Sequence, residues 1–175
     1  MTKNLYLFVG RSATGKTTIV SEVCERLGLS AVSSYTDRPK RYPGEEGHIF
    51  LSKEGFDALP DKLACAKFAG HRYCTTKSIL DVCDCFVIEP KGLRELKQMY
   101  DTRPIVVIGI YAPMRTIVDR MRGRGDSEDQ IKVRLDHDEI AFGMMDELCD
   151  VVFVNRDLVS TASDVISYIK HRESD

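Results

Sequence analysis

The sequence predicts an α/β fold in which a parallel sheet lies between two layers of helices, a three-layer sandwich. Its 175 residues are about what one domain needs. Along the chain, short apolar segments alternate with segments whose apolar residues recur at helical spacing. Strands separated by helices favour parallel pairing, with helices covering both faces of the sheet.

Four short apolar runs are the expected strands of this sheet. The first consists only of Leu, Tyr, Phe and Val, which is typical of a parallel strand buried on both faces. In chain order the expected strands are Leu5–Val9, residues 85–88, Ile105–Tyr111 and Val151–Val154.

Two helices are predicted from apolar spacing and from the residues at their ends. The first covers residues 17–27 and stops at Gly28, because glycine is common just beyond a helix C-terminus. The second follows Pro113, which suits a first helical turn, and runs to about residue 122.

Two further helices are predicted from capping pairs. Ser127 with Gln130 has the spacing of a capping box, and a helix of about 15 residues is expected after it. Thr161 with Asp164 has similar spacing, so we expect the last helix to be capped there.

Residues 34–84 interrupt the pattern, because they are rich in Pro, Gly, Tyr and charge. We interpret them as a lobe inserted into a core of residues 1–33 and 85–175. Two or three short strands and a helix near residues 76–82 are expected there. A second interruption, residues 120–126, has two glycines and three arginines and predicts a mobile cationic loop within a lid of residues 120–134.

Composition excludes several classes of function. The 25 basic and 27 acidic residues nearly cancel, so nothing global indicates nucleic-acid binding. No apolar run approaches the ~20 residues of a membrane span. The six cysteines include no CxxC pair, and we expect reduced thiols in a cytoplasmic protein.

The segment from Gly10 to Thr17 fits the pattern G-x-x-x-x-G-K-[ST], a P-loop. Its glycines allow a tight turn whose backbone N–H groups converge on phosphate oxygens, and the next helix adds its positive N-terminal end. Lys16 is expected to bridge the β- and γ-phosphates, and the Thr17 hydroxyl to bind Mg²⁺. Binding of a nucleoside triphosphate follows.

Arginines outside the P-loop indicate a kinase. Arg38 and Arg41 lie three apart in a proline-stiffened loop and could grip one phosphate with forked donors. Taken alone, such a pair is more often a solvated face. The arginine-rich residues 120–124 and Tyr73 change this balance, because phosphoryl transfer between two phosphates needs cations on both sides.

Taken in order, these motifs resemble the guanylate kinase family along almost the whole chain. The resemblance rests on the P-loop and on four later motifs. They are Ser34, Thr36, Arg38, Arg41, Gly44 and Glu45; then Gly70, Tyr73, Thr75, Thr76 and Lys77; then residues 122–126 with Glu128, Ile131, Arg134 and Leu135; and finally Val152, Asn155, Asp157 and Leu158.

This resemblance implies ATP with Mg²⁺ and a nucleoside monophosphate, most readily GMP, as substrates. The implied ATP-binding residues are Gly10, Ser12, Ala13, Thr14, Gly15, Lys16, Thr17 and Thr18, with Asn155 near adenine. The implied acceptor-binding residues are Ser34, Arg38, Arg41, His48, Tyr73, Thr75 and Glu89. The implied catalytic residues, which neutralise the transferring phosphoryl group, are Lys16, Arg120, Arg124 and Arg134.

Three positions depart from the family pattern. His48 stands in place of a phosphate-binding tyrosine, and Glu89 is the one carboxylate left of an Asp-x-Asp pair. Ala64 aligns with the glutamate that accepts hydrogen bonds from guanine. An alanine accepts none, and losing such an acceptor relaxes or changes the choice of base.

Three hypotheses follow. The leading one is a nucleoside monophosphate kinase of the guanylate kinase type. The second keeps the chemistry but changes the acceptor to another nucleotide or a sugar phosphate, as Ala64 suggests. The third is a non-catalytic guanylate kinase-like module that binds a protein, which the intact Lys16 and P-loop glycines disfavour.

Overall fold

The structure is a computed structural model and describes residues 2–40, 42–68, 70–143 and 145–174. Its central sheet has the order β6-β1-β7-β8, and all neighbours pair in parallel. The strands are β1 (Leu5–Val9), β6 (Cys85–Val87), β7 (Ile105–Tyr111) and β8 (Val151–Val154). The predicted parallel sheet is confirmed.

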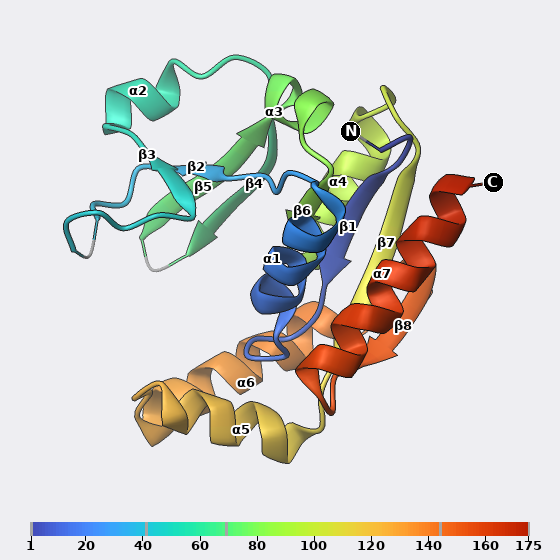
Figure 1. The fold of residues 1–175 in the computed structure, drawn as a ribbon. Coiled ribbons are helices and arrows are strands. Elements are labelled where there is room, and N and C mark those ends of the chain that lie inside the picture. Colours follow the sequence, from blue (N-terminus) through green and yellow to red (C-terminus); the bar gives the residue numbers. More distant parts are fainter. Residues whose placement is uncertain (1, 41, 69, 144, 175) are drawn as a thin grey trace.

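Helices cover both faces of this sheet, and β1 is therefore buried on both sides. Tyr6 and Phe8 point toward α1 (Lys16–Leu27) and α7 (Leu158–Ser174). Leu5, Leu7 and Val9 point toward α4 (Pro90–Met99) on the opposite face. Figure 1 shows the resulting three layers. No predicted element covers α4, although Pro90 in its first turn was a usable signal.

A second sheet is formed by the residues that interrupt the core pattern. Its order is β3-β2-β5-β4, and it stands apart from the central sheet in Figure 1. The strands are β2 (Ser34–Thr36), β3 (His48–Phe50), β4 (Lys62–Phe68) and β5 (His71–Thr76), with helices α2 (Lys53–Asp57) and α3 (Lys77–Val82). The sheet has four strands, more than the two or three expected, because β4 and β5 form a hairpin that apolar runs did not reveal.

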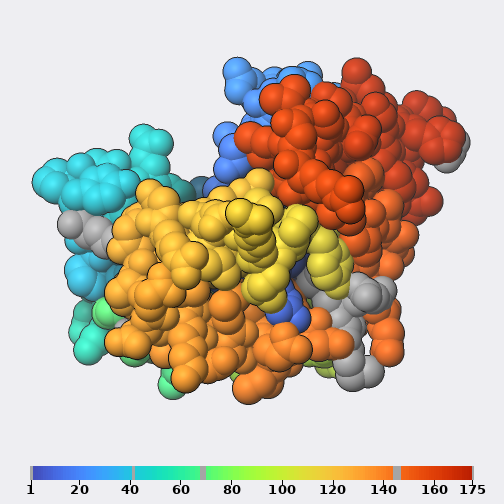
Figure 2. Space-filling view, turned by 90° about the horizontal axis from the view of Figure 1, so that it is seen from below, coloured from blue at the N-terminus to red at the C-terminus, as the bar shows by residue number. Residues whose placement is uncertain are grey.

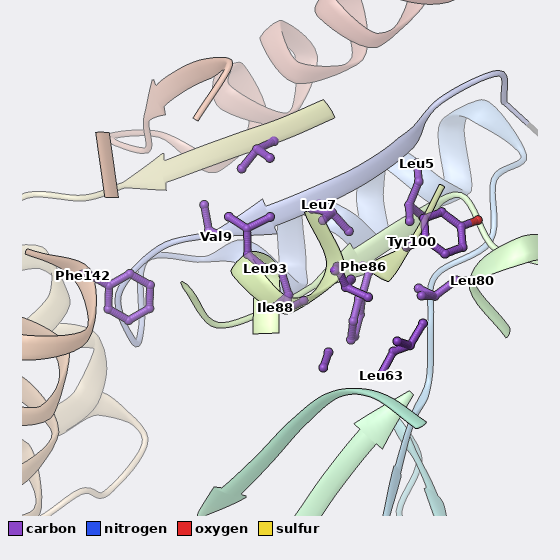
Figure 3. Packing of buried hydrophobic residues seen from close by; sticks show 13 residues of the cluster. Leu5, Leu7, Val9, Leu63, Leu80, Phe86, Ile88, Leu93, Tyr100 and Phe142 are labelled. Carbon is purple, nitrogen blue, oxygen red and sulfur yellow. The ribbon is translucent and has the colours of Figure 1, made fainter. Parts of the chain in front are cut away.

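The apolar cluster on the α4 side connects the second sheet to the core. Leu63 of β4 and Phe142, the last residue of α6 (Glu128–Phe142), pack with the β1 and α4 side chains (Figure 3). The second sheet is therefore anchored by apolar contact at the β4 end.

Helices α5 (Met114–Gly123) and α6 (Glu128–Phe142) lie below the carboxyl ends of the central strands, and a short 3₁₀ turn (Met145–Leu148) follows. Seen from below, they fill the space between the second sheet and α7 (Figure 2). The predicted capping box of Ser127 and Gln130 is present. Pro113 occupies the N-cap position, one residue before the expected first turn.

The predicted start of the last helix is wrong. Helix α7 begins at Leu158, and the Asp157 carboxylate accepts the backbone N–H of Ser160 at 2.8 Å. Thr161 is a buried helical residue whose hydroxyl donates to the Asp157 carbonyl at 2.7 Å. Asp157 was the better cap because it lies directly after the loop that leaves β8.

No described helix has the length and apolar character required to cross a membrane. The six cysteines are free thiols.

Candidate active site

The loop between β1 and α1 has the backbone of a phosphate cradle. Ala13 and Gly15 have positive φ angles of 57° and 96°. A Cβ at Gly10 would lie 2.2 Å from the Ile110 carbonyl oxygen, and one at Gly15 would lie 2.4 Å from the Asn155 amide nitrogen. Glycine is therefore required at both ends of the loop. At Gly10 the β7 backbone is too close for a side chain, and at Gly15 the Asn155 side chain is too close.

Lys16 is folded back onto this loop. Its Nζ donates to the Gly10 and Arg11 carbonyls at 2.6 and 2.7 Å. Burial lowers the pKa of Lys16 from 10.5 to about 8, while the charges of Asp138 and Glu89 oppose the shift. The cation expected to contact the nucleotide is thus held by the loop that would bind the phosphates.

Helix α6 presents an acidic residue to the same loop. The Asp138 carboxylate accepts the Ser12 backbone N–H at 2.6 Å, and Asp138 is only 3% exposed. Beside it, Glu139 pairs with Arg11 at 2.7 Å. Asp138 was not among the predicted site residues. It lies seven residues after Ile131 and four before Phe142, so it shares the buried face of α6 with them. A carboxylate on an apolar helix face is a signal of a functional group.

One cavity of about 360 Å³ joins the P-loop to the second sheet. Gly10, Ser12, Lys16 and Asp138 line one side of it. The predicted acceptor residues Ser34, His48, Tyr73 and Glu89 line the cavity as well, with Ala64, Ala66, Phe86, Val87, Ile88, Gly92 and Phe142. The structure therefore brings together two groups of predicted residues that lie far apart in the sequence.

Ala64 lines the apolar part of this cavity. The residue has a φ of 53° and lies where the β4–β5 register shifts between Leu63 and Ala66. Ala64 is 7% exposed, and a Cβ added at Gly92 of α4 would lie 3.1 Å from its Cβ. The position aligned with a base-reading carboxylate is thus held against a helix and offers no hydrogen-bond acceptor.

The predicted phosphate-binding arginine of the second sheet is paired internally. Arg38 donates to Glu45 through two nitrogens, at 2.9 and 3.1 Å, and its guanidinium lies 5.1 Å from the Phe50 ring centroid. Hydrogen bonding, first to Glu45 and also to Tyr73, raises the Arg38 pKa despite burial. The Tyr73 ring lies 5.5 Å from the His48 ring. Arg41 lies outside the described residues.

Thr75, the other predicted base contact, is fully buried in β5. Its hydroxyl oxygen has no hydrogen-bond partner among the residues that the structure describes. It does not line the cavity as Ser34 does.

The predicted lid arginines divide into two groups. Arg120 donates to the Ala13 carbonyl at 3.2 Å and lies at the P-loop. Arg124 and Arg134 instead face Asp126, at 2.6 and 4.0 Å. A second cavity of about 250 Å³ on this side is lined by Ala13, Gly15, Thr18, Arg120, Arg124 and Leu158.

Asn155 supports the P-loop from the end of β8. Its side-chain nitrogen donates to the Thr14 carbonyl at 2.7 Å, and the residue is fully buried. Its amide oxygen has no hydrogen-bond partner among the described residues. Thr14 is itself buried and donates its hydroxyl to the Arg11 carbonyl at 2.9 Å.

Thr17 and Thr18 are exposed in the first turn of α1. Mg²⁺ prefers oxygen ligands and, in nucleotide sites, keeps several waters and phosphate oxygens. The Thr17 hydroxyl, which makes no hydrogen bond within the described part of the chain, fits one such position, and the Glu89 carboxylate lines the same cavity as Lys16. Among the described residues no group of three or more His, Cys, Asp or Glu could hold a metal ion.

Known guanylate kinases resemble this chain along nearly its whole length. The enzyme of Thermotoga maritima is 30% identical, over 97% of this chain and 87% of its own. That of Hydrogenovibrio crunogenus is 34% identical, over 77% of this chain and 72% of its own. This chain belongs to the guanylate kinase family.

The structural comparison agrees on the fold. A crystal structure of guanylate kinase from Anaplasma phagocytophilum superposes with a TM-score of 0.71 and 21% identity, covering 99% of this chain and 88% of that one. No protein-family model matches the chain. As a guanylate kinase family member with an intact P-loop, the chain is a nucleotide kinase, a phosphotransferase.

Proposed function

We propose that this chain transfers the γ-phosphoryl group of ATP to GMP, giving ADP and GDP. The observation that carries the proposal is the single cavity in which Lys16 and Gly10 of the P-loop meet Ser34, Tyr73 and Glu89. Its two ends fit a donor and an acceptor that must come within reach of in-line transfer.

On the donor side, the amides of residues 10–18 bind the triphosphate. Lys16 leaves the Gly10 and Arg11 carbonyls and neutralises the β- and γ-phosphates. Arg120 already lies at the loop and contributes a second cation. Thr17 would hold Mg²⁺, which would supply positive charge that offsets the charge of the phosphates.

On the acceptor side, Tyr73, Arg38 and Arg41 hold the monophosphate, with His48 as a further donor. Ser34, which lines the cavity, and Thr75, which is buried in β5, are the proposed base contacts, and Glu89 is a further acceptor-binding residue. The phosphate oxygen of the acceptor is ionised at neutral pH, so it attacks without a general base, and positioning and charge carry the rate.

The reaction requires closure of two segments over the core. Residues 34–84 form the acceptor-binding lobe and residues 120–134 the lid. Arg124 and Arg134 must exchange Asp126 for the transferring phosphoryl group. Closure excludes water and so limits hydrolysis of ATP. The free thiols and balanced charge fit a cytoplasmic enzyme.

A second candidate differs in the acceptor. Ala64 and its neighbours Ala66, Ile88 and Phe142 give the cavity an apolar wall where guanine needs an acceptor for its N1–H and amino group. Another nucleoside monophosphate, or a sugar phosphate, would then be the acceptor.

An ADP-release assay with GMP, dGMP, AMP, CMP, UMP, sugar phosphates and no acceptor separates these possibilities. Strong turnover with GMP supports the main proposal. Turnover with AMP, a pyrimidine nucleotide or a sugar phosphate in preference to GMP supports the second. Failure to bind ATP would leave a non-catalytic module.

A further inference from the structure

The phosphate cradle already holds an anion that belongs to the chain. The Ser12 N–H, one of the P-loop amides that would contact a phosphate oxygen, donates to the Asp138 carboxylate at 2.6 Å. That distance is short, and hydrogen bonds to an ionised acceptor are shorter than those between neutral groups. A carboxylate oxygen thus occupies a position suited to a phosphate oxygen.

Burial makes this contact energetically significant. Asp138 is 3% exposed, and a buried carboxylate is stable only when it is paired and hydrogen-bonded. Its partners are the Ser12 N–H, the nearby charge of Lys16 and the His137 imidazole, whose nitrogen lies 3.5 Å from the second carboxylate oxygen. Asp138 and Lys16 also line the same cavity.

We propose that Asp138 acts as an internal phosphate mimic, which latches helix α6 onto the P-loop and which the phosphates of an incoming nucleotide must displace. A nucleotide phosphate and Asp138 compete for the same amide, and two anions at one cradle repel each other. This proposal rests on nucleotide binding by the P-loop, as proposed above, but not on the identity of the acceptor.

The latch also links the P-loop to the lid. Arg134 lies four residues before Asp138, so the two side chains share one face of α6. Arg134 faces Asp126 at 4.0 Å. Release of Asp138 frees α6 to bring Arg134 toward the phosphates, so binding of the donor and placement of a lid cation become one event.

The first test measures binding of inorganic tripolyphosphate by calorimetry at pH 6.5, below the pKa of about 8 that Lys16 has in the wild-type chain. Asp138→Asn keeps the shape and an acceptor oxygen but removes the charge. We expect it to bind tripolyphosphate about tenfold more tightly than wild type, within the range of coupling energies between sites.

Two charge-matched controls localise the effect. Glu139→Gln removes the same charge one residue away, from an ion pair with Arg11 in which the Glu139 side chain is exposed, and Asp129→Asn removes one in the first turn of α6. Each is expected to change affinity less than twofold, as exposed ion pairs contribute little. An equal gain in all three variants, or no gain in Asp138→Asn, overturns the latch.

A second test uses the wild-type protein alone, so it does not depend on the folding of a variant. Saturating tripolyphosphate is expected to accelerate amide hydrogen exchange in residues 134–142 of α6. Unchanged or slower exchange in this segment contradicts the proposal.

Failure of the latch and failure of the proposed function give different results. If tripolyphosphate behaves as expected while GMP is not phosphorylated, the latch stands and the acceptor assignment fails. If neither ATP nor tripolyphosphate binds to wild type or to Asp138→Asn, both proposals fail.

Discussion

The P-loop and the acceptor cavity face each other across one small volume, but they are built in different ways. The P-loop is one contiguous segment whose function resides in backbone amides and two glycines. The acceptor end is assembled from side chains on β2, β3, β4, β5 and the segment that follows β6. Backbone geometry tolerates few substitutions, whereas scattered side chains can be replaced one at a time. His48, Ala64 and Glu89, which depart from the family pattern, all lie on the acceptor side.

The largest expected loss of activity tests the donor side and follows from replacing Lys16. Lys16→Ala removes the P-loop cation that we propose neutralises the β- and γ-phosphates, and we expect kcat/KM for ATP to fall by about 10³-fold, as for other preorganised charges. The thermal midpoint should not fall. The measurement is a coupled ADP-release assay with thermal unfolding as a check.

A matched control is Lys170→Ala, which removes an exposed lysine of α7. It should retain nearly full activity. Retention of most activity in Lys16→Ala would show that the P-loop is not the donor site.

The pH dependence of ATP binding is the next largest effect, and it again concerns the donor side. The pKa of Lys16 is about 8 in the folded chain, set by burial and opposed by Asp138 and Glu89. ATP needs the protonated amine, so affinity should fall above pH 8, by up to about tenfold per pH unit. Binding isotherms from pH 6.5 to 9.5 measure it.

The same pKa has a consequence for stability. Between pH 8 and the ordinary value of 10.5, the unfolded chain binds the Lys16 proton more tightly than the folded chain does. The contribution of Lys16 to the free energy of unfolding therefore rises with pH over this window. Lys16→Arg, charged throughout, should show neither trend, and a flat wild-type binding profile would contradict the expectation.

The sequence predicted the central fold well because its signals are local. A strand buried on both faces reads as an unbroken apolar run, and the Ser127 capping box needs only four consecutive residues. The start of α7 was missed because Asp157 and Thr161 both have capping chemistry, and only the path of the chain after β8 decides between them.

The site was predicted less completely, because tertiary packing decides which partner each charge finds. The sequence indicates that Arg124 and Arg134 are cationic, but not that both face Asp126. Asp138 reaches Ser12 from 126 residues away, so no local pattern could place it in the P-loop.

The smallest expected effect is at Tyr73, and it tests the acceptor side alone. Tyr73→Phe removes one hydroxyl beside the guanidinium of Arg38 and leaves the ring against His48. A hydrogen bond to a charged phosphate contributes about 1.5–3 kcal/mol, so we expect KM for GMP to rise about tenfold. Affinity for ATP should not change, because no hydrogen bond joins Tyr73 to the P-loop among the described residues.

The matched control is Tyr42→Phe, at a residue that is 61% exposed, which should leave both constants near wild type. A change in ATP affinity with an unchanged KM for GMP would reverse the assignment of the two ends of the cavity, and the division between a backbone-built donor site and a side-chain-built acceptor site would then be lost.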